Sequence, residues 1–362
     1  MNAKNCVYLV VFIFAIADGH TALNCKDSEP LFFQSNAPLA FLVQGNFDQV
    51  NDHTIEAHEK ERASSDGSLF LEKSQIIIPV KISARGAFRF EECPLRPFNL
   101  QLLDKKSKGE FPFIRNFSKL KLTTICYDQK EYREGEIRKL LKEYTIYKML
   151  NHLKGPHLQI RLLHLKLLDP EGKIYFEGPG FLRETEKAIG ARCGLVERLP
   201  TLMKWNNETR SSNRWMQLED RSLVPYVYQR DREAELRAEF INRFLNNQDF
   251  NFDLDHNIIP LVSRDSNQLV EYSIPYDFDL AQAAGATYFS QNTPVMELAK
   301  QTKDWLFNTQ KIAPELAVEI ANEFLNSLHG MKMEVEKSPL DSKGKIDLIQ
   351  WIDAYQKTFA SI

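Results

Sequence analysis

The chain has no marked excess of charge of either sign, since its 362 residues carry 46 basic and 49 acidic side chains for a net charge of −3. No overall field therefore favours nucleic acid or an anionic membrane as a partner. We find no internal repeat, no low-complexity tract, no CxxC pair and no His/Cys cluster of the kind that binds zinc. With 43% hydrophobic residues and 24 Phe, the composition predicts a packed core, either in one large domain or in two lobes that share a cleft.

The N-terminus is typical of a secretory signal. Lys4 precedes an apolar run over 6–17, and the small residues around Ala17 and Ala22 fit a cleavage site. The run is too short for a stable spanning helix, and no later segment reaches the ~18 uninterrupted apolar residues that spanning requires. We therefore predict a signal peptide over 1–22 and a periplasmic or secreted protein without a stable membrane span. An uncleaved anchor is the alternative.

Cleavage would remove Cys6 and leave four cysteines, Cys25, Cys93, Cys126 and Cys193. An even number in an oxidising compartment permits two disulfides. Spacing alone does not choose among the pairings.

The hydrophobic periodicity predicts an α+β protein in three parts after the signal: an extension over 23–75 with a long polar loop at 48–68, a β-rich part over 76–180, and a mainly helical part over 181–362. Strands are predicted at 76–82, 87–90, 98–103, 119–125, 159–168 and 173–176, with a hairpin at 258–262 and 269–274. Helices are predicted at 132–153, 231–246, 294–309, 314–329 and 342–359.

The region 246–280 concentrates the chemistry. Asp249 follows a buried helix, Asn257 precedes the hairpin, and Asp277 and Asp279 follow it. The hairpin can bring Asn257 and Asp277 together, and Asp279 shares the face of Asp277 if the strand continues, because side-chain direction repeats every second residue. A base aspartate followed by oxygen ligands for magnesium is the order in which a phosphotransferase presents its groups. Taken singly, each of these residues is equally typical of a turn, a helix cap or a calcium site.

Phosphoryl transfer also needs a lysine that grips the phosphates, usually held by a glutamate on a nearby helix. Glu143 lies in the middle of the predicted helix 132–153, and Lys119 and Lys121 share one face of the preceding strand. We predict that one of these lysines pairs with Glu143. The alternative is that all three side chains are solvated surface groups.

The ordered set resembles the CotH family of atypical, protein-kinase-like proteins, and looks closer still to exported bacterial proteins related to that family. The resemblance covers about 76–290 and rests on these stretches: Arg85-Gly86-Ala87-Phe88-Arg89 with Cys93-Pro94-Leu95, Lys119 to Thr123 up to Cys126, Lys142-Glu143-Tyr144 with Tyr147-Lys148-Met149-Leu150, Arg161-Leu162-Leu163 through the turn at Asp169, Asn247-Gln248-Asp249, His256-Asn257, and Pro275-Tyr276-Asp277-Phe278-Asp279. The chain lacks the family's fuller Arg-Gly-Asn-Ser-type segment, and it also lacks the Gly-rich phosphate loop of ordinary kinases.

The resemblance implies a two-lobed kinase-like fold, with a β-rich N-lobe that carries one long helix and a mainly helical C-lobe. It implies transfer of the γ-phosphoryl group of ATP to a hydroxyl of a protein acceptor, for example in the cell envelope, with Mg²⁺ or Mn²⁺. The implied catalytic residues are Asp249, Lys121 and Glu143; Lys119 and Arg85 would contact the nucleotide; and Asn257, Asp277 and Asp279 would hold the metal. The resemblance also implies that Cys93 pairs with Cys126, which leaves Cys25 and Cys193 for a second bridge.

Two other hypotheses stay open. The periplasm and the cell exterior hold little ATP, so the chain is alternatively a non-catalytic envelope or surface protein on a related scaffold. A third hypothesis is a calcium-binding exported protein that uses Asp253, Asp255, Asp277 and Asp279.

Overall fold

The N-terminal half of the protein forms a β-barrel. In this computed structural model, the structure describes residues 25, 33, 35, 37–55, 63–71, 77–86, 88–103, 119–199, 201–206, 211–218, 221–226, 228–263, 270–286, 293–309 and 312–360. The barrel is closed, with strand order β1-β2-β3-β4-β5-β7-β6. Its strands are β1 (Leu39–Gly45), β2 (Ser64–Leu71), β3 (Ile77–Ala84), β4 (Phe98–Leu102), β5 (Lys119–Thr123), β6 (Ile160–Leu168) and β7 (Ile174–Arg183).

β1 closes the barrel because it pairs on both edges, antiparallel with β2 and parallel with β6. Alternation of apolar and polar residues directs one face of each strand inward, as in β3, where every second residue is buried. Gly45 of β1 and Gly67 of β2 make room for the Ile82 side chain of β3, because a Cβ at either position would lie within 2.7 Å of it. The barrel interior is therefore filled by side chains.

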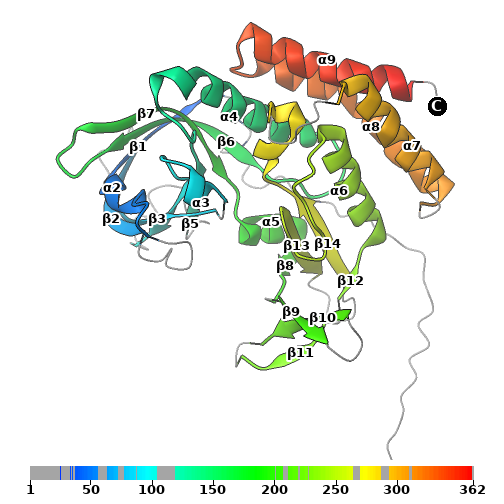
Figure 1. Ribbon diagram of the computed structural model, residues 1–362, viewed down its shortest axis with the longest axis horizontal. Helices are drawn as coiled ribbons and strands as arrows, with labels where there is room; N and C mark the ends of the chain where they lie inside the picture. The colour runs from blue at the N-terminus through cyan, green and yellow to red at the C-terminus, as the bar shows by residue number, and fades with distance from the viewer. Residues whose placement is uncertain are drawn as a thin grey trace, which may run out of the picture.

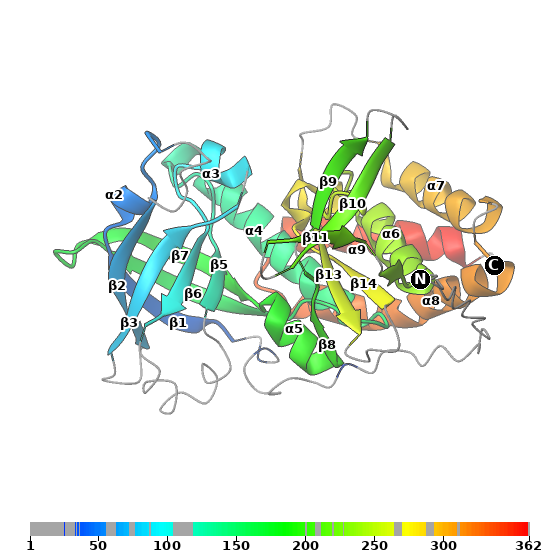
Figure 2. The ribbon, with the colours of Figure 1, turned by 90° about the horizontal axis from the view of Figure 1, so that it is seen from below.

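The long helix α4 (Lys130–Leu150) links the two halves of the molecule. It packs against β6 and β7 on one side and against α8 (Pro314–Lys337) on the other. Figure 2 shows α4 running from the barrel toward the C-terminal helices. Its last eleven residues, from Leu140 onward, are all buried, so its C-terminal half is enclosed on all sides.

The C-terminal half combines two small sheets with helices. One sheet has the order β12-β14-β13-β8 and the other β11-β10-β9. The strands are β8 (Leu195–Glu197), β9 (Thr201–Asn206), β10 (Ser211–Gln217), β11 (Leu223–Pro225), β12 (Gln229–Arg230), β13 (Ile258–Ser263) and β14 (Val270–Pro275), and the helices are α5 (Glu186–Cys193), α6 (Arg232–Leu245), α7 (Val295–Asn308), α8 and α9 (Ser342–Phe359). Short helices complete the fold: α2 (Phe47–Val50), α3 (Phe88–Glu92), η3 (Phe278–Leu280) and η4 (Gln282–Ala284).

An aromatic cluster holds the C-terminal helices together. Phe240 and Phe244 of α6 make edge-to-face contacts with Phe324 of α8, which in turn contacts Tyr355 and Phe359 of α9. Such rings bury large apolar areas and prefer these tilted geometries. Figure 1 shows α7, α8 and α9 gathered on the side of the molecule away from the barrel.

The prediction of a two-lobed, kinase-like fold is wrong. The structure has a closed seven-stranded barrel in the N-terminal half and helices at the C-terminal end. The closing strands β1 and β2 come from the segment predicted as an extension, and β2 begins inside the predicted loop at 48–68. The polar sequence of β2 does not favour a strand, so the sequence did not predict it. It forms a strand because β1 and β3 pair with it on both edges.

Other local predictions also need correction. The predicted strand at 87–90 is the helix α3, whereas the predicted helices at 132–153, 231–246, 294–309, 314–329 and 342–359 all exist. Besides the predicted hairpin, the described residues after 181 include five strands, β8 to β12, that the helical pattern did not reveal. These strands are two to seven residues long, too short for a clear alternation.

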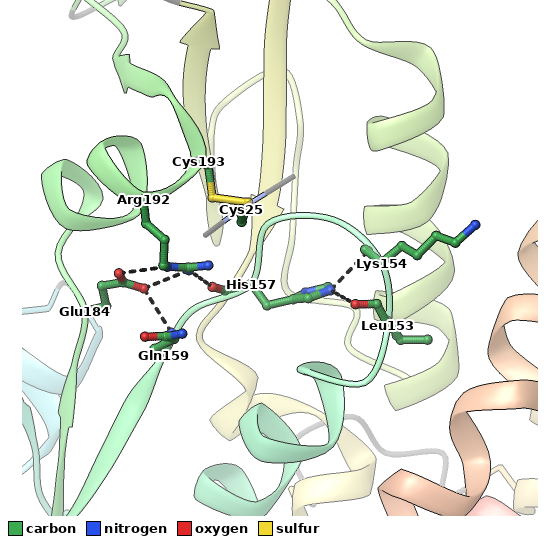
Figure 3. The surroundings of a disulfide bond; sticks show 8 residues. All are labelled: Cys25, Leu153, Lys154, His157, Gln159, Glu184, Arg192 and Cys193. Atoms are coloured by element: carbon green, nitrogen blue, oxygen red, sulfur yellow. Dashed lines mark hydrogen bonds and ion pairs between the residues drawn. A yellow bond between two sulfur atoms is a disulfide. The ribbon is translucent and has the colours of Figure 1, made fainter. Parts of the chain in front are cut away.

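Two disulfides are present and match the pairing that the resemblance implied. Cys93 pairs with Cys126, and Cys25 pairs with Cys193 (Figure 3). Such bonds are typical of proteins that fold in oxidising compartments. Within the described ranges, every helix is too short or too polar to cross a bilayer. The predicted signal peptide lies outside the described residues.

Candidate functional site

The β13–β14 hairpin places Asn257 and Asp277 side by side. Ile258 pairs with Pro275 at the open end of the hairpin, and the Tyr276 N–H donates to the Asn257 carbonyl at 3.0 Å. Both Asn257 and Asp277 adopt a left-handed backbone, with φ of 53° and 63°. Such conformations cost roughly 1–3 kcal/mol in non-glycine residues and gather at functional sites. The hairpin therefore brings the backbones of Asn257 and Asp277 near one another.

Asp249 joins this pair through Asn257. The Asn257 side chain donates from Nδ2 to the Asp249 carbonyl at 2.6 Å and to its Oδ2 at 2.9 Å. The other carboxylate oxygen, Oδ1, lies 2.8 Å from His256 Nε2. The helix before them, α6, ends at Asn246 with a left-handed cap, which turns the chain toward the hairpin. Asp249, His256 and Asn257 thus form one hydrogen-bonded group, and Asp277 follows the other strand of the hairpin.

Arg89 connects the segment after the hairpin to α4. Its Nε donates to Asp279 Oδ2 at 2.9 Å, and its Nη2 donates to Glu143 Oε2 at 3.3 Å. Glu143 and Asp279 are 2% and 8% exposed, so the arginine offsets two buried carboxylates. Burial raises the pKa of Glu143 to about 7, against the attraction of Arg89 and with the help of Asp279. Sequence reasoning assigned no role to Arg89 and placed it in a predicted strand at 87–90, whereas it lies on the helix α3.

Lys121 does not pair with Glu143, so that prediction is wrong. Its Nζ forms a short ion pair with Glu186 at the start of α5. Burial and the neighbouring Arg183 lower the pKa of Lys121 to about 8. Lys121 and Arg183 face one another because β5 and β7 pair in that register, which no single strand reveals. Lys119, two residues earlier on the same strand, is exposed.

Three arginines act on Asp277. Arg85 donates to the Leu122 carbonyl and to Thr123 Oγ1, Arg183 lies 4.5 Å above the Tyr276 ring, and both attract Asp277 together with Arg89. Burial lowers the pKa of Arg85 to about 10. Even so, burial and the charge of Asp279 raise the pKa of Asp277. Its N–H donates to Tyr147 Oη at 2.8 Å.

Some of the oxygen atoms near the hairpin could bind a small hard cation, and others already have partners. Among the described residues, no hydrogen bond or ion pair holds the Asp277 carboxylate, and Asn257 donates through Nδ2, which leaves Oδ1 for a cation. Asp279 is already bound by Arg89. Over the described ranges, no group of at least three His, Cys, Asp or Glu side chains could hold a metal ion. Any site here would thus depend on Asp277, Asn257 and oxygens of a ligand, which suits magnesium better than calcium.

The aspartates of the calcium hypothesis have other partners. Asp253 pairs with Arg230 at 3.0 Å, and Asp255 forms a short ion pair with Arg198. Both arginines also bind Glu271, which is buried. These contacts direct Asp253 and Asp255 to an ionic cluster at the sheet rather than to Asp277.

The comparisons with known proteins leave the family open. No family model matches the chain, and no curated protein matches it. The resemblance to the CotH family therefore stays a prediction.

Proposed function

We propose that this chain is an exported phosphotransferase that moves the γ-phosphoryl group of ATP to a hydroxyl of a protein acceptor, assisted by Mg²⁺ or Mn²⁺. The observation that carries the proposal is the hydrogen-bonded pair of Asp249 and Asn257 at the end of the hairpin that leads to Asp277, together with the three arginines that act on Asp277. The proposal rests on this site and not on a fold. The two disulfides support export.

The site supplies the two things that phosphoryl transfer needs most, which are alignment and positive charge. In the proposed step, Asp249 accepts the proton of the acceptor hydroxyl while the hydroxyl oxygen bonds to the γ-phosphorus and the bond to the β-phosphate oxygen breaks. Arg85, Arg183 and Lys121 would contact the phosphate oxygens. Asp277 and Asn257 would hold the metal, which supplies neutralisation of the charge that develops on the phosphate oxygens.

Direct detection of transfer tests this proposal. The secreted chain is incubated with ATP and Mg²⁺ or Mn²⁺ and with cell-envelope proteins, and phosphorylated peptides are identified by mass spectrometry. We expect transfer that falls at least 100-fold in Asp249→Asn and Asp277→Asn. Asp253→Asn is the matched control, since Asp253 lies on the same loop but binds Arg230. Absence of transfer together with absence of any nucleotide-dependent rise in melting temperature would remove the proposal, as would an equal loss in the control.

A binding function without catalysis is the second candidate, and one observation favours it. Both carboxylate oxygens of Asp249 already have partners, His256 and Asn257, and Lys121 is bound to Glu186. A site locked in this way holds a phosphorylated ligand without activating a hydroxyl. This candidate predicts that ATP with Mg²⁺ raises the melting temperature equally in wild type and Asp249→Asn, with no transfer in either.

A further inference from the structure

A row of polar side chains crosses the outer face of the barrel beside the candidate site. The strand register places Ser83 of β3 opposite Asn99 of β4, Asn99 opposite Lys121 of β5, and Lys121 opposite Arg183 of β7. The residues next to them in β3, β4 and β5, such as Leu100, belong to the buried core of the barrel. Because side-chain direction alternates along a strand, the four polar side chains lie together on the outer face.

This row is enclosed, whereas the next row on the same face is exposed. Asn99 and Arg183 are 8% and 7% exposed. Two residues beyond Asn99 on the same face of β4, Gln101 is exposed, and so is Lys119, which lies opposite it on β5. At the other end of the row, the Arg183 guanidinium lies 4.5 Å from the centre of the Tyr276 ring. The enclosed row therefore ends at the candidate site.

The hydrogen bonding of this row is incomplete. Asn99 Oδ1 and Arg183 Nε are buried atoms that have no hydrogen-bond partner within the part of the chain that the structure describes. Glu186 pairs with both cations of the row, with Lys121 in a short contact and with Arg183 at 3.9 Å. Buried polar atoms are normally hydrogen-bonded, because an unpaired one loses its bonds to water without replacement. A ligand that supplies a donor to Asn99 Oδ1 would remove this cost.

The two ends of the row differ in charge. Ser83 and Asn99 offer a neutral hydroxyl and amide, whereas Lys121 and Arg183 are cations. Neighbouring strands lie about 4.8 Å apart, so three strand spacings give the row a length of roughly 14 Å. A single phosphate or sulfate would contact only part of that length. The row therefore suits an extended ligand that has a neutral polar part at one end and an anionic part at the other, which is the chemistry of a nucleotide.

We propose that Asn99 is a specificity-determining residue, which binds the nucleoside part of the phosphoryl donor while Lys121 and Arg183 contact its phosphates. Asn99 Oδ1 accepts from an N–H of the base or an O–H of the sugar, and this bond gives the buried oxygen the partner that the fold does not supply. The inference rests on the proposed function, because that function brings phosphate oxygens to Lys121 and Arg183.

Isothermal titration calorimetry on the secreted chain tests this inference, with ATP and inorganic tripolyphosphate as ligands in the presence of Mg²⁺. Both ligands have three linked phosphates, but only ATP has a nucleoside. We expect Asn99→Ala to weaken the binding of ATP about tenfold, the loss of one buried hydrogen bond, and to leave the binding of tripolyphosphate unchanged. Gln101→Ala is the matched control, because Gln101 carries an amide on the same face of β4 but is exposed. It should bind both ligands as wild type does.

The outcomes separate this inference from the proposed function. If Asn99→Ala weakens both ligands equally, or weakens neither, the role of Asn99 is overturned even where phosphate transfer is detected. If it weakens ATP alone and no transfer occurs, the role of Asn99 in binding is supported and the catalytic proposal is removed. Binding of neither ligand to wild type overturns both. Asn99→Leu, which keeps a side chain of similar size without the amide, gives the same comparison if Asn99→Ala does not fold.

Discussion

His157 should make the protein less stable as the pH falls below 6.5. The side chain is buried beside the Cys25–Cys193 disulfide, and its Nε2 lies 3.0 Å from the Leu153 carbonyl and 3.2 Å from the Lys154 carbonyl (Figure 3). Since carbonyls only accept, Nε2 carries the proton of a neutral imidazole. Burial, assisted by the charge of Arg192, lowers the pKa of His157 to about 4.

The sign follows from the two protonation states. Between pH 6.5 and 4 the unfolded chain binds a proton at His157 that the folded chain excludes, so the free energy of unfolding falls as the pH falls. A pKa that drops from 6.5 to about 4 corresponds to about 3 kcal/mol in total, of which about 2 kcal/mol is lost by pH 5. The contribution is fully present above pH 6.5.

Urea unfolding from pH 7.5 to 5 in wild type and His157→Gln measures this loss. Glutamine also donates to the two carbonyls but does not titrate, so we expect its free energy of unfolding to fall by about 2 kcal/mol less than that of wild type. Exposed His164 provides the control variant, His164→Gln, which should follow wild type. Equal slopes in wild type and His157→Gln, or an NMR titration that places the pKa of His157 near 6.5, would refute the reasoning.

Three further predictions concern other parts of the molecule. Burial raises the pKa of Glu143 from 4.5 to about 7, so between these pH values the folded chain holds a proton that the unfolded chain releases. As the pH rises from 4.5 to 7, the free energy of unfolding of wild type should therefore fall by up to about 3 kcal/mol relative to that of Glu143→Gln, as measured by urea unfolding. Parallel curves for the two proteins would contradict this. Replacing Cys93 and Cys126 with Ala should lower the free energy of unfolding by about 4 kcal/mol, since the bond closes a loop with a sequence separation of 33; a loss below 1 kcal/mol in calorimetry would argue against it. Gly330→Ala should cost about 1–3 kcal/mol by clashing with His152, and a second change, His152→Ala, should restore most of it; no recovery in the double variant would place the strain elsewhere.

The long helices were predictable because their signals are local. Helix α4 and the helices α6 to α9 each carry an apolar pattern over fourteen residues or more, bounded by Asp, Pro or Ser near their starts. The barrel was not predictable in the same way. Its closure depends on pairing of β1 with β6, which lie more than a hundred residues apart, and on β2, whose sequence is polar.

In the candidate site, too, the contacts between residues close in the chain were predictable and those between distant elements were not. Asn257 and Asp277 flank one hairpin, so the approach of their backbones follows from local chain geometry and was predicted. The partners of Lys121 and Glu143 were not, because the choice between Glu186 and Arg89 depends on how β5, β7, α3 and α4 pack.

The amino-acid sequence by itself determined the helical segments, the hairpin that joins Asn257 to Asp277, and the presence of enough cysteines for two bridges. These features depend on periodicity and on residues close together in the chain. Only the tertiary structure decided the barrel and the ionic partners of the site. Ion pairs form between whichever charges the packing of distant elements brings within about 4 Å, and no local pattern records that distance.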